Sequence, residues 1–190
     1  MRATTALFLL LVLAYVVAIL LFPASYISNL GFSSVSLLQG GRLWTAVTYV
    51  FAHADAFHLA FNLLFLYVFG NALESKVGAT RLVSAFFAGG IAGVLLSIPF
   101  YPSDTTIIGA SIAVSALVGA VIVLNPNAKS SPLFLYLPLG LLAVIYVIFN
   151  VFMLSYDQSG GVAWPSHIIG FAIGVVLGLE WRAKKPLGAS

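Results

Sequence analysis

Long apolar segments constrain this chain more than any other feature of its sequence. A helix that crosses a bilayer needs roughly 20 mainly apolar residues and at least about 17. Six stretches meet this requirement: Ala6 to Phe22, Phe57 to Leu73, Leu82 to Ile98, Ile107 to Leu124, Leu133 to Leu154 and Val162 to Leu179. Because 62% of the residues are hydrophobic and only 7% are charged, the chain lacks the polar surface of a soluble domain. We predict an all-α polytopic membrane protein of six transmembrane helices, with residues 1–190 forming a single domain in the lipid bilayer.

The distribution of Lys and Arg predicts the orientation of these helices. Seven of the eight basic residues lie at the N-terminus, in the second and fourth connections, or at the C-terminus, and only Arg42 lies on the other side. Because Lys and Arg accumulate in cytoplasmic loops, both termini should be cytoplasmic. The basic residues are too thinly spread to follow a phosphate backbone, which argues against nucleic acid as a partner. Cysteine is absent, so disulfides and thiolate metal sites are excluded.

The first connection, residues 23–56, is too long to be a turn. It is rich in apolar and aromatic residues, among them Trp44 and Tyr49. Two interpretations remain open. The segment is either a partly helical element lying in the membrane interface, with these two rings as anchors, or a loop packed on the bundle.

Polar groups inside a membrane span are costly and by default indicate function. All five carboxylates lie at or beyond the end of a predicted span, which argues against a transporter-like proton relay and against HExxH metalloprotease chemistry. The polar residues that remain inside are uncharged: His58, Asn62, Ser111, Ser115, Asn150, Ser166 and His167.

Two groups of these residues could bind an anion. His58 and Asn62 are four residues apart, so they share one helical face and could direct two hydrogen-bond donors at one point. Alternatively, they join neighbouring helices. Ser111 follows Gly109 near a predicted helix start, where unpaired backbone N–H groups could hold an oxyanion, although a capping or packing serine fits the same position.

The sixth span carries a histidine next to a close-packing surface. Gly170 and Gly174 form a G-x-x-x-G face that allows a neighbouring helix to approach closely, and His167 lies on that face. If successive spans alternate in direction, His58, Ser111 and His167 all fall in the outer half of the membrane and can converge. A serine beside a neutral histidine gains a general base, which predicts a Ser-His dyad without a carboxylate member.

These residues give the chain a resemblance to the rhomboid family of intramembrane serine proteases, extending from about Arg42 to Glu180. Residues 43–53 resemble the family segment that leads into H-x-x-x-x-H-x-x-x-N, here His53, His58 and Asn62. Residues 69–74, the glycines of residues 89–93, and Ser166-His167 with Gly170 and Gly174 resemble further family landmarks. Six spans are also the minimal core of the family.

The resemblance implies a function and a set of roles. The chain would be a serine endopeptidase that cleaves transmembrane helices of membrane-anchored proteins near the outer face, in the cytoplasmic membrane of a prokaryote. Ser111 would be the nucleophile and His167 the base, whereas His58, Asn62 and the Ser111 N–H would bind the oxyanion. Gly109, Gly170 and Gly174 would support this geometry. No metal or other cofactor is implied.

Three positions depart from the family pattern. Ile112 replaces the glycine that usually lets the serine helix press against the histidine helix, Ser115 stands where an aromatic ring often stacks on the histidine, and Thr45 replaces an arginine. Two alternatives therefore remain. The first is a rhomboid-like protein that binds transmembrane helices without cleaving them, and the second is an enzyme whose nucleophile is Ser115.

Overall fold

The computed structural model describes residues 1–130, 136–156 and 163–184, and this part of the chain is mainly helical, without a β-strand. The bundle consists of α1 (Ala3–Leu21), α5 (Ala56–Phe65), α6 (Asn71–Val77), α7 (Ala79–Leu96), α8 (Ser111–Leu124), α9 (Leu139–Tyr156) and α10 (Trp164–Ala183). The predicted all-α class is therefore confirmed for the described residues. Leu133 to Leu135 of the fifth predicted span, Val162 of the sixth, the connection 157–161 and the basic residue Lys185 lie outside them.

Among the residues that the structure describes, four helical segments are long and apolar enough to cross a membrane: α1, the continuous helix Ala56–Val77, α7 and α10. Helix α8 and residues Leu139–Leu154 of α9 are apolar but shorter. The count of six membrane crossings thus stays a prediction.

The second predicted span continues further than the sequence suggested. A five-residue π-helical stretch, η2 (Leu66–Gly70), joins α5 to α6, and the helix ends at Val77, before Gly78 with a φ of +83°. Glu74 therefore lies within the helix and not beyond its end, as the predicted span Phe57 to Leu73 had implied. Its carboxylate accepts hydrogen bonds from the backbone N–H groups of Ala3 (2.8 Å) and Thr4 (2.9 Å) and from the Thr4 hydroxyl (2.6 Å). An anion at a helix N-terminus is stabilising, so Glu74 anchors the start of α1.

The fourth predicted span begins later than expected. Helix α8 starts at Ser111 and not at Ile107, because the preceding residues are held in an extended conformation. The backbones of Phe32 and Ile107 exchange two hydrogen bonds of 2.9 and 2.7 Å. Gly109 then adopts a φ of +99°, which an L side chain rarely permits. Ser111 is consequently the first residue of the helix.

The first connection is folded into short helical segments. These are α2 (Tyr26–Leu30), α3 (Ser34–Leu38), α4 (Thr45–Thr48) and a 3-10 turn, η1 (Tyr49–Phe51). Tyr49 is fully buried, and its hydroxyl donates a 2.8 Å hydrogen bond to the carbonyl of Gly90 on α7. Residues 23–55 are therefore partly helical and packed on the bundle, and their position in the membrane interface stays a prediction.

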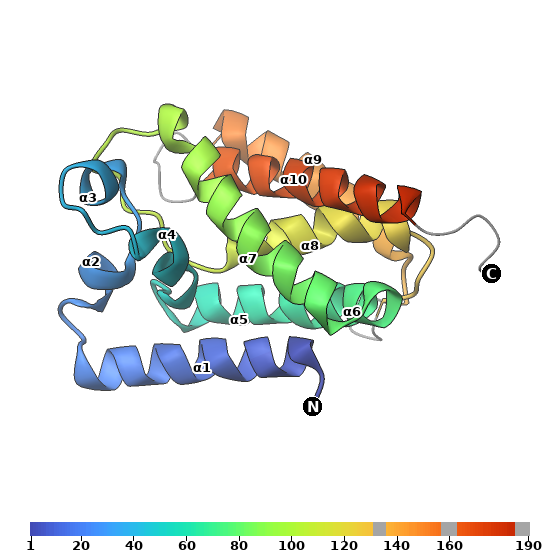
Figure 1. Ribbon diagram of the computed structural model, residues 1–190, viewed down its shortest axis with the longest axis horizontal. Coiled ribbons are helices and arrows are strands. Elements are labelled where there is room, and N and C mark those ends of the chain that lie inside the picture. The colour runs from blue at the N-terminus through green and yellow to red at the C-terminus, as the bar shows by residue number, and fades with distance from the viewer. Residues whose placement is uncertain (131–135, 157–162, 185–190) are drawn as a thin grey trace.

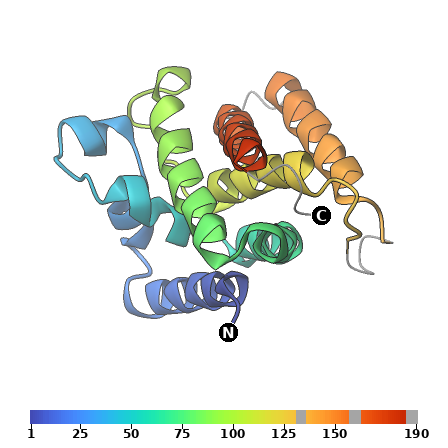
Figure 2. The ribbon, with the colours of Figure 1, turned by 45° about the vertical axis from the view of Figure 1, so that its right-hand side comes forward.

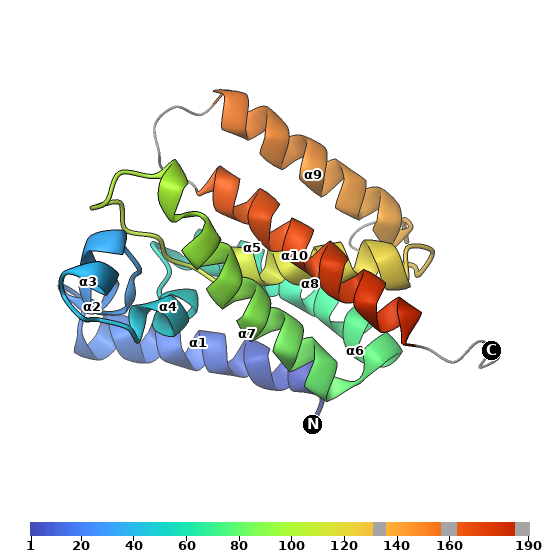
Figure 3. The ribbon, with the colours of Figure 1, turned by 45° about the horizontal axis from the view of Figure 1, so that its top comes forward.

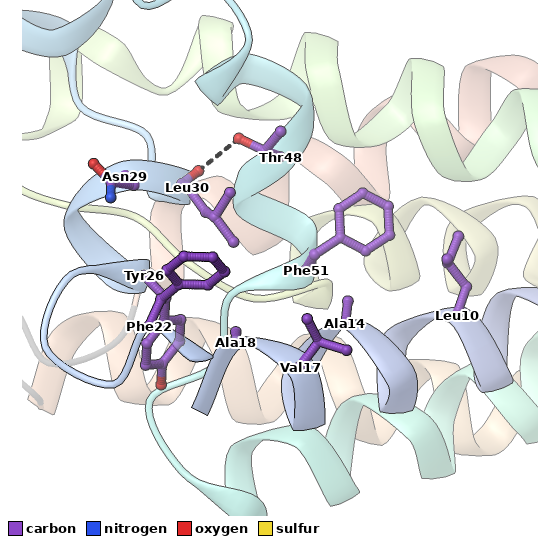
Figure 4. Close-up of a pocket in the computed structure, with 10 residues that line it drawn as sticks. All are labelled: Leu10, Ala14, Val17, Ala18, Phe22, Tyr26, Asn29, Leu30, Thr48 and Phe51. Carbon is purple, nitrogen blue, oxygen red and sulfur yellow. Dashed lines mark hydrogen bonds between the residues drawn. The ribbon is translucent and has the colours of Figure 1, made fainter. Parts of the chain in front are cut away.

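A pocket of about 460 Å³ opens between α1 and the short helices α2 and α4 (Figure 4). Its walls are mainly apolar and include Phe22 and Phe51. The Thr48 hydroxyl donates a 2.9 Å hydrogen bond to the carbonyl of Leu30 and ties α4 to α2 beside it. None of the sequence-predicted site residues lines this pocket.

Helix α8 lies at the centre of the bundle, among α5, α7, α9 and α10 (Figure 2). All residues from Ile112 to Val121 are buried. The first turns of α5, α8 and α10 lie toward the same end of the molecule as α2 and α3, whereas the start of α1 and the end of α10 lie toward the other end (Figure 1). This arrangement brings the starts of three helices together, and these starts carry the polar residues of the spans.

Candidate active site

Helices α8 and α10 are in backbone contact. A Cβ atom on Gly174 would lie only 1.9 Å from the carbonyl oxygen of Ala116, and one on Gly170 would lie 2.5 Å from the carbonyl oxygen of Ile112. Any side chain at these two glycines would separate the helices. The two helices lie side by side along much of their length (Figure 3), and the close approach brings their first turns together.

This contact joins Ser111 to His167. Ser111 is the first residue of α8, and His167 lies in the first turn of α10, with 7% of its surface exposed. The Oγ atom of Ser111 lies 2.7 Å from Nε2 of His167, which is hydrogen-bonding distance. The indole of Trp164 contacts the imidazole edge-on, with a centroid separation of 5.7 Å. A hydroxyl on a neutral imidazole is an arrangement that can transfer a proton.

A third side chain completes this group, and the sequence reasoning did not assign it to the site. Asn150 of α9 is 2% exposed, and its Oδ1 lies 2.8 Å from Nδ1 of His167. The sequence showed a polar residue inside the fifth span, which was the available sign of a role. It did not show which partner the amide faces, because that depends on how α9 packs against α10.

His58 and Asn62 lie on the other side of the α8 start. A Cβ on Gly109 would be 2.5 Å from Nε2 of His58 and 3.5 Å from Nδ2 of Asn62, so both side chains border the turn that leads into Ser111. Nδ1 of His58 accepts from the Ala54 N–H at 3.5 Å, which leaves the ring hydrogen on Nε2. One amide hydrogen of Asn62 is donated to the carbonyl of His58 at 2.9 Å. The structure thus directs N–H groups of His58 and Asn62 toward the segment before Ser111.

His53 stabilises this turn through a hydrogen bond to its backbone. The side chain is fully buried, and its Nε2 accepts a 3.5 Å hydrogen bond from the N–H of Ala110. Burial and, to a lesser extent, the nearby His58 lower the pKa of His53 to about 4, although the hydrogen bond to the Phe51 carbonyl acts in the opposite direction. His53 is therefore neutral at physiological pH and holds the residue that precedes Ser111.

Ile112 does not keep α8 and α10 apart, because both neighbouring helices have glycines beside it. Its side chain is 1% exposed, and its Cγ2 would lie 2.5 Å from a Cβ on Gly93 of α7 and 3.1 Å from a Cβ on Gly170. The bulk that is missing from the two glycines is thus supplied by Ile112. The departure from the family pattern at this position is compensated within the bundle.

Ser115, the second departure, is occupied by other contacts. Its hydroxyl donates a 2.7 Å hydrogen bond to the carbonyl of Ser111 and shares a further hydrogen bond with the Tyr146 hydroxyl of α9. The residue is fully buried. These contacts describe a serine that links α8 to α9, one turn deeper than Ser111.

The side chains of the site do not form a metal centre. Within the ranges that the structure describes, no three His, Cys, Asp or Glu residues are grouped so that they could hold a metal ion. His53 and His58 are close, with ring centroids 5.1 Å apart, but both ring nitrogens of His53 and Nδ1 of His58 face backbone N–H and carbonyl groups.

Known proteins are similar to this chain over most of its length. Residues 40–183 match the rhomboid domain family. Over 148 residues the chain is 32% identical to "Rhomboid protease GluP" of Bacillus subtilis (strain 168), covering 76% of this chain and 28% of that protein. Over 166 residues it is 26% identical to "Rhomboid-like protease 1" of Toxoplasma gondii, covering 85% of this chain and 56% of that protein.

A further relative is "Rhomboid protease GlpG" of Serratia proteamaculans (strain 568), which is 28% identical over 142 residues, 72% of this chain and 47% of that protein. The chain thus spans about half the length, or less, of these curated relatives. The family match extends over most of the chain and includes every helix that contributes to the site. This chain is therefore an integral membrane protein that belongs to the rhomboid family.

Proposed function

We propose that this chain is an intramembrane serine endopeptidase, with Ser111 as nucleophile and His167 as general base. The observation that carries the proposal is the 2.7 Å separation between Ser111 Oγ and His167 Nε2 inside a mainly apolar bundle. Polar groups buried in a membrane protein are expensive, so a serine and a histidine that meet at the starts of two helices favour a catalytic role.

The reaction follows from the positions of the atoms. Nε2 of His167 takes the hydroxyl proton as Ser111 Oγ bonds to the scissile carbonyl carbon. His167 then gives that proton to the leaving amine as the carbon–nitrogen bond breaks. Water attacks the resulting acyl-enzyme, with His167 again as base, and regenerates the Ser111 hydroxyl.

His58, Asn62 and the backbone N–H of Ser111 are the proposed oxyanion donors. Ser111 is the first residue of α8, where backbone N–H groups have no intrahelical partner and the helix dipole is positive. The side chains of His58 and Asn62 border the preceding Gly109. In comparable sites, removal of one such donor raises the barrier by about 3 kcal/mol.

The depth of the site supports transmembrane helices as substrates. Helix α8 has 14 residues, which correspond to about 21 Å, whereas the hydrocarbon core is about 30 Å thick. If the end of α8 at Leu124 reaches one surface, Ser111 lies about 9 Å beneath the other. A substrate helix would have to unwind locally near that surface to present an extended peptide bond.

The orientation of the protein follows from its charges. The start of α1, the end of α10 and the connection between α6 and α7 lie toward one end of the bundle (Figure 1), and these segments carry most of the Lys and Arg residues of the chain. We infer that this end is cytoplasmic and that Ser111 and His167 lie near the outer face of the cytoplasmic membrane of a prokaryote.

A serine-directed fluorophosphonate probe tests the proposal. The wild-type protein in detergent should be labelled on Ser111, and Ser111→Ala should not. Ser115→Ala should still be labelled, because Ser111 and His167 are both intact. Labelling that is lost in Ser115→Ala and kept in Ser111→Ala would show that Ser115, and not Ser111, is the nucleophile. A folded wild-type protein that is not labelled would favour a rhomboid-like protein that binds helices without cleaving them.

A further inference from the structure

Helix α9 brings an amide to the face of His167 that is turned away from Ser111. Oδ1 of Asn150 lies 2.8 Å from Nδ1 of the imidazole, and both residues are buried. The imidazole therefore has a hydrogen-bond partner on each of its nitrogens, namely Ser111 on Nε2 and Asn150 on Nδ1.

The orientation of the Asn150 amide is fixed by a second contact. Its Nδ2 donates a 2.8 Å hydrogen bond to the backbone carbonyl of Tyr146, one turn earlier on α9. Because that carbonyl only accepts, the NH2 group must face it, and Oδ1 must face the imidazole. An amide oxygen likewise only accepts, so Nδ1 of His167 must carry the ring hydrogen. A neutral imidazole has one such hydrogen, which leaves Nε2 free to accept the Ser111 proton.

We propose that Asn150 is the positioning residue of the Ser111–His167 pair: it selects the reactive imidazole tautomer and stabilises the imidazolium that forms during attack. This inference rests on the proposed function. The arrangement has the logic of a nucleophile–base–orienter triad, in which an asparagine can take the third place. It differs from the Ser-His dyad expected from the sequence, because a third side chain, on α9, orients the base.

A neutral amide suits this position better than a carboxylate. An ionised carboxylate inside the bundle would lose its hydration, whereas an amide with both ends hydrogen-bonded has a small desolvation cost. Asn150 therefore orients the base without placing a charge in the membrane, which fits a sequence that has no acid in the interior of its spans.

The test compares the fluorophosphonate labelling rate as a function of pH in the wild type, Asn150→Leu and Asn150→Asp. Asn150→Leu should be labelled about 10²- to 10⁴-fold more slowly, which is the usual contribution of a correctly placed general base. In its neutral, protonated form Asn150→Asp retains both bonds, with its carbonyl oxygen accepting from Nδ1 of His167 and its hydroxyl donating to the Tyr146 carbonyl, so it should retain most of the rate.

Asn71→Leu is the matched control. Asn71 makes the same type of hydrogen bond, from Nδ2 to the Tyr67 carbonyl one turn earlier at 2.7 Å, but lies at the far end of the α5–α6 helix. It reports the effect of losing such a bond on folding, and its labelling rate should equal that of the wild type. The thermal unfolding of each variant is measured together with its labelling rate.

Two results would overturn the inference. One is an Asn150→Leu protein with the wild-type rate and pH profile, and the other is an equal loss of rate in Asn150→Leu and Asn150→Asp. Failure of the proposed function has a different signature, because the wild type itself would then not be labelled at Ser111. The ¹⁵N chemical shifts of His167 provide a readout that is independent of activity. They should show hydrogen on Nδ1 in the wild type and a mixture of tautomers in Asn150→Leu.

Discussion

Ile112→Ala should destabilise the bundle, although this change moves the chain toward the small residue of the family pattern that the sequence resembles. The Ile112 side chain is 1% exposed and fills the space beside Gly93 and Gly170, at the point where α7, α8 and α10 meet. Truncation of a buried Ile to Ala costs about 2–5 kcal/mol in soluble proteins. The lower end applies here, because lipid replaces water as the solvent and the loss is mainly one of packing.

A destabilisation of about 2 kcal/mol corresponds to a fall in Tm of about 4–8 °C for a domain of this size. Ile112→Gly should cost about 1 kcal/mol more, because glycine disfavours a helix interior. Both variants should be labelled more slowly by the fluorophosphonate, since a looser α8–α10 contact moves Ser111 away from His167.

Thermal unfolding in detergent measures the effect, with Ile148→Ala as the matched control. Ile148 lies on α9 with 63% of its surface exposed to the surroundings of the bundle, so the same truncation there leaves no cavity and should change Tm little. An Ile112→Ala protein as stable as the wild type, or an Ile112→Gly protein with a faster labelling rate, would show that the three helices do not need the Ile112 side chain to fill the space between them.

Three further predictions concern the neighbouring residues. Gly174→Ala places a Cβ within 1.9 Å of the Ala116 carbonyl oxygen, so it should separate α8 from α10 and slow labelling at least about tenfold; an unchanged rate would contradict this. Gly109→Ala would place a side chain at a φ of +99°, with its Cβ only 2.5 Å from Nε2 of His58, so it should abolish labelling. A variant labelled at the wild-type rate would disprove this prediction. Because the pKa of folded His53 is lowered to about 4, the unfolded chain binds a proton that the folded chain excludes, and stability should fall by about 2–3 kcal/mol as the pH drops from about 6.5 to about 4. Thermal unfolding of His53→Gln should show a shallower pH dependence, and an equal one would contradict the assignment.

Much of the architecture could be predicted because lipid imposes strong rules on a sequence. Apolar runs of about 20 residues located the helices, and α1, α7 and α10 lie within a few residues of their expected positions. The start of α8 could not be predicted from hydropathy, since Ile107 and Ile108 are as apolar as the helix that follows. Its position depends on the bonds between Ile107 and Phe32, which are distant in the sequence.

The polar residues of the candidate site could be identified from the sequence, but the contacts between helices that bring them together could not. Each polar residue inside a span stood out, because the surrounding sequence is so apolar. The partner of Asn150 did not follow, because a hydrogen bond between α9 and α10 depends on the rotation and depth of both helices. The same limit applied to Ile112, whose fit depends on Gly93 of a third helix.

Cleavage of a synthetic transmembrane substrate in liposomes tests most directly whether Ser111 and His167 hydrolyse a peptide bond. The cut site is determined by mass spectrometry. We predict that the wild type makes a single cut in the outer part of the substrate helix. The cleavage rate should fall at least about 10³-fold in both Ser111→Ala and His167→Ala. Cleavage by Ser111→Ala at the wild-type rate would contradict the claim that this serine and histidine hydrolyse the peptide bond.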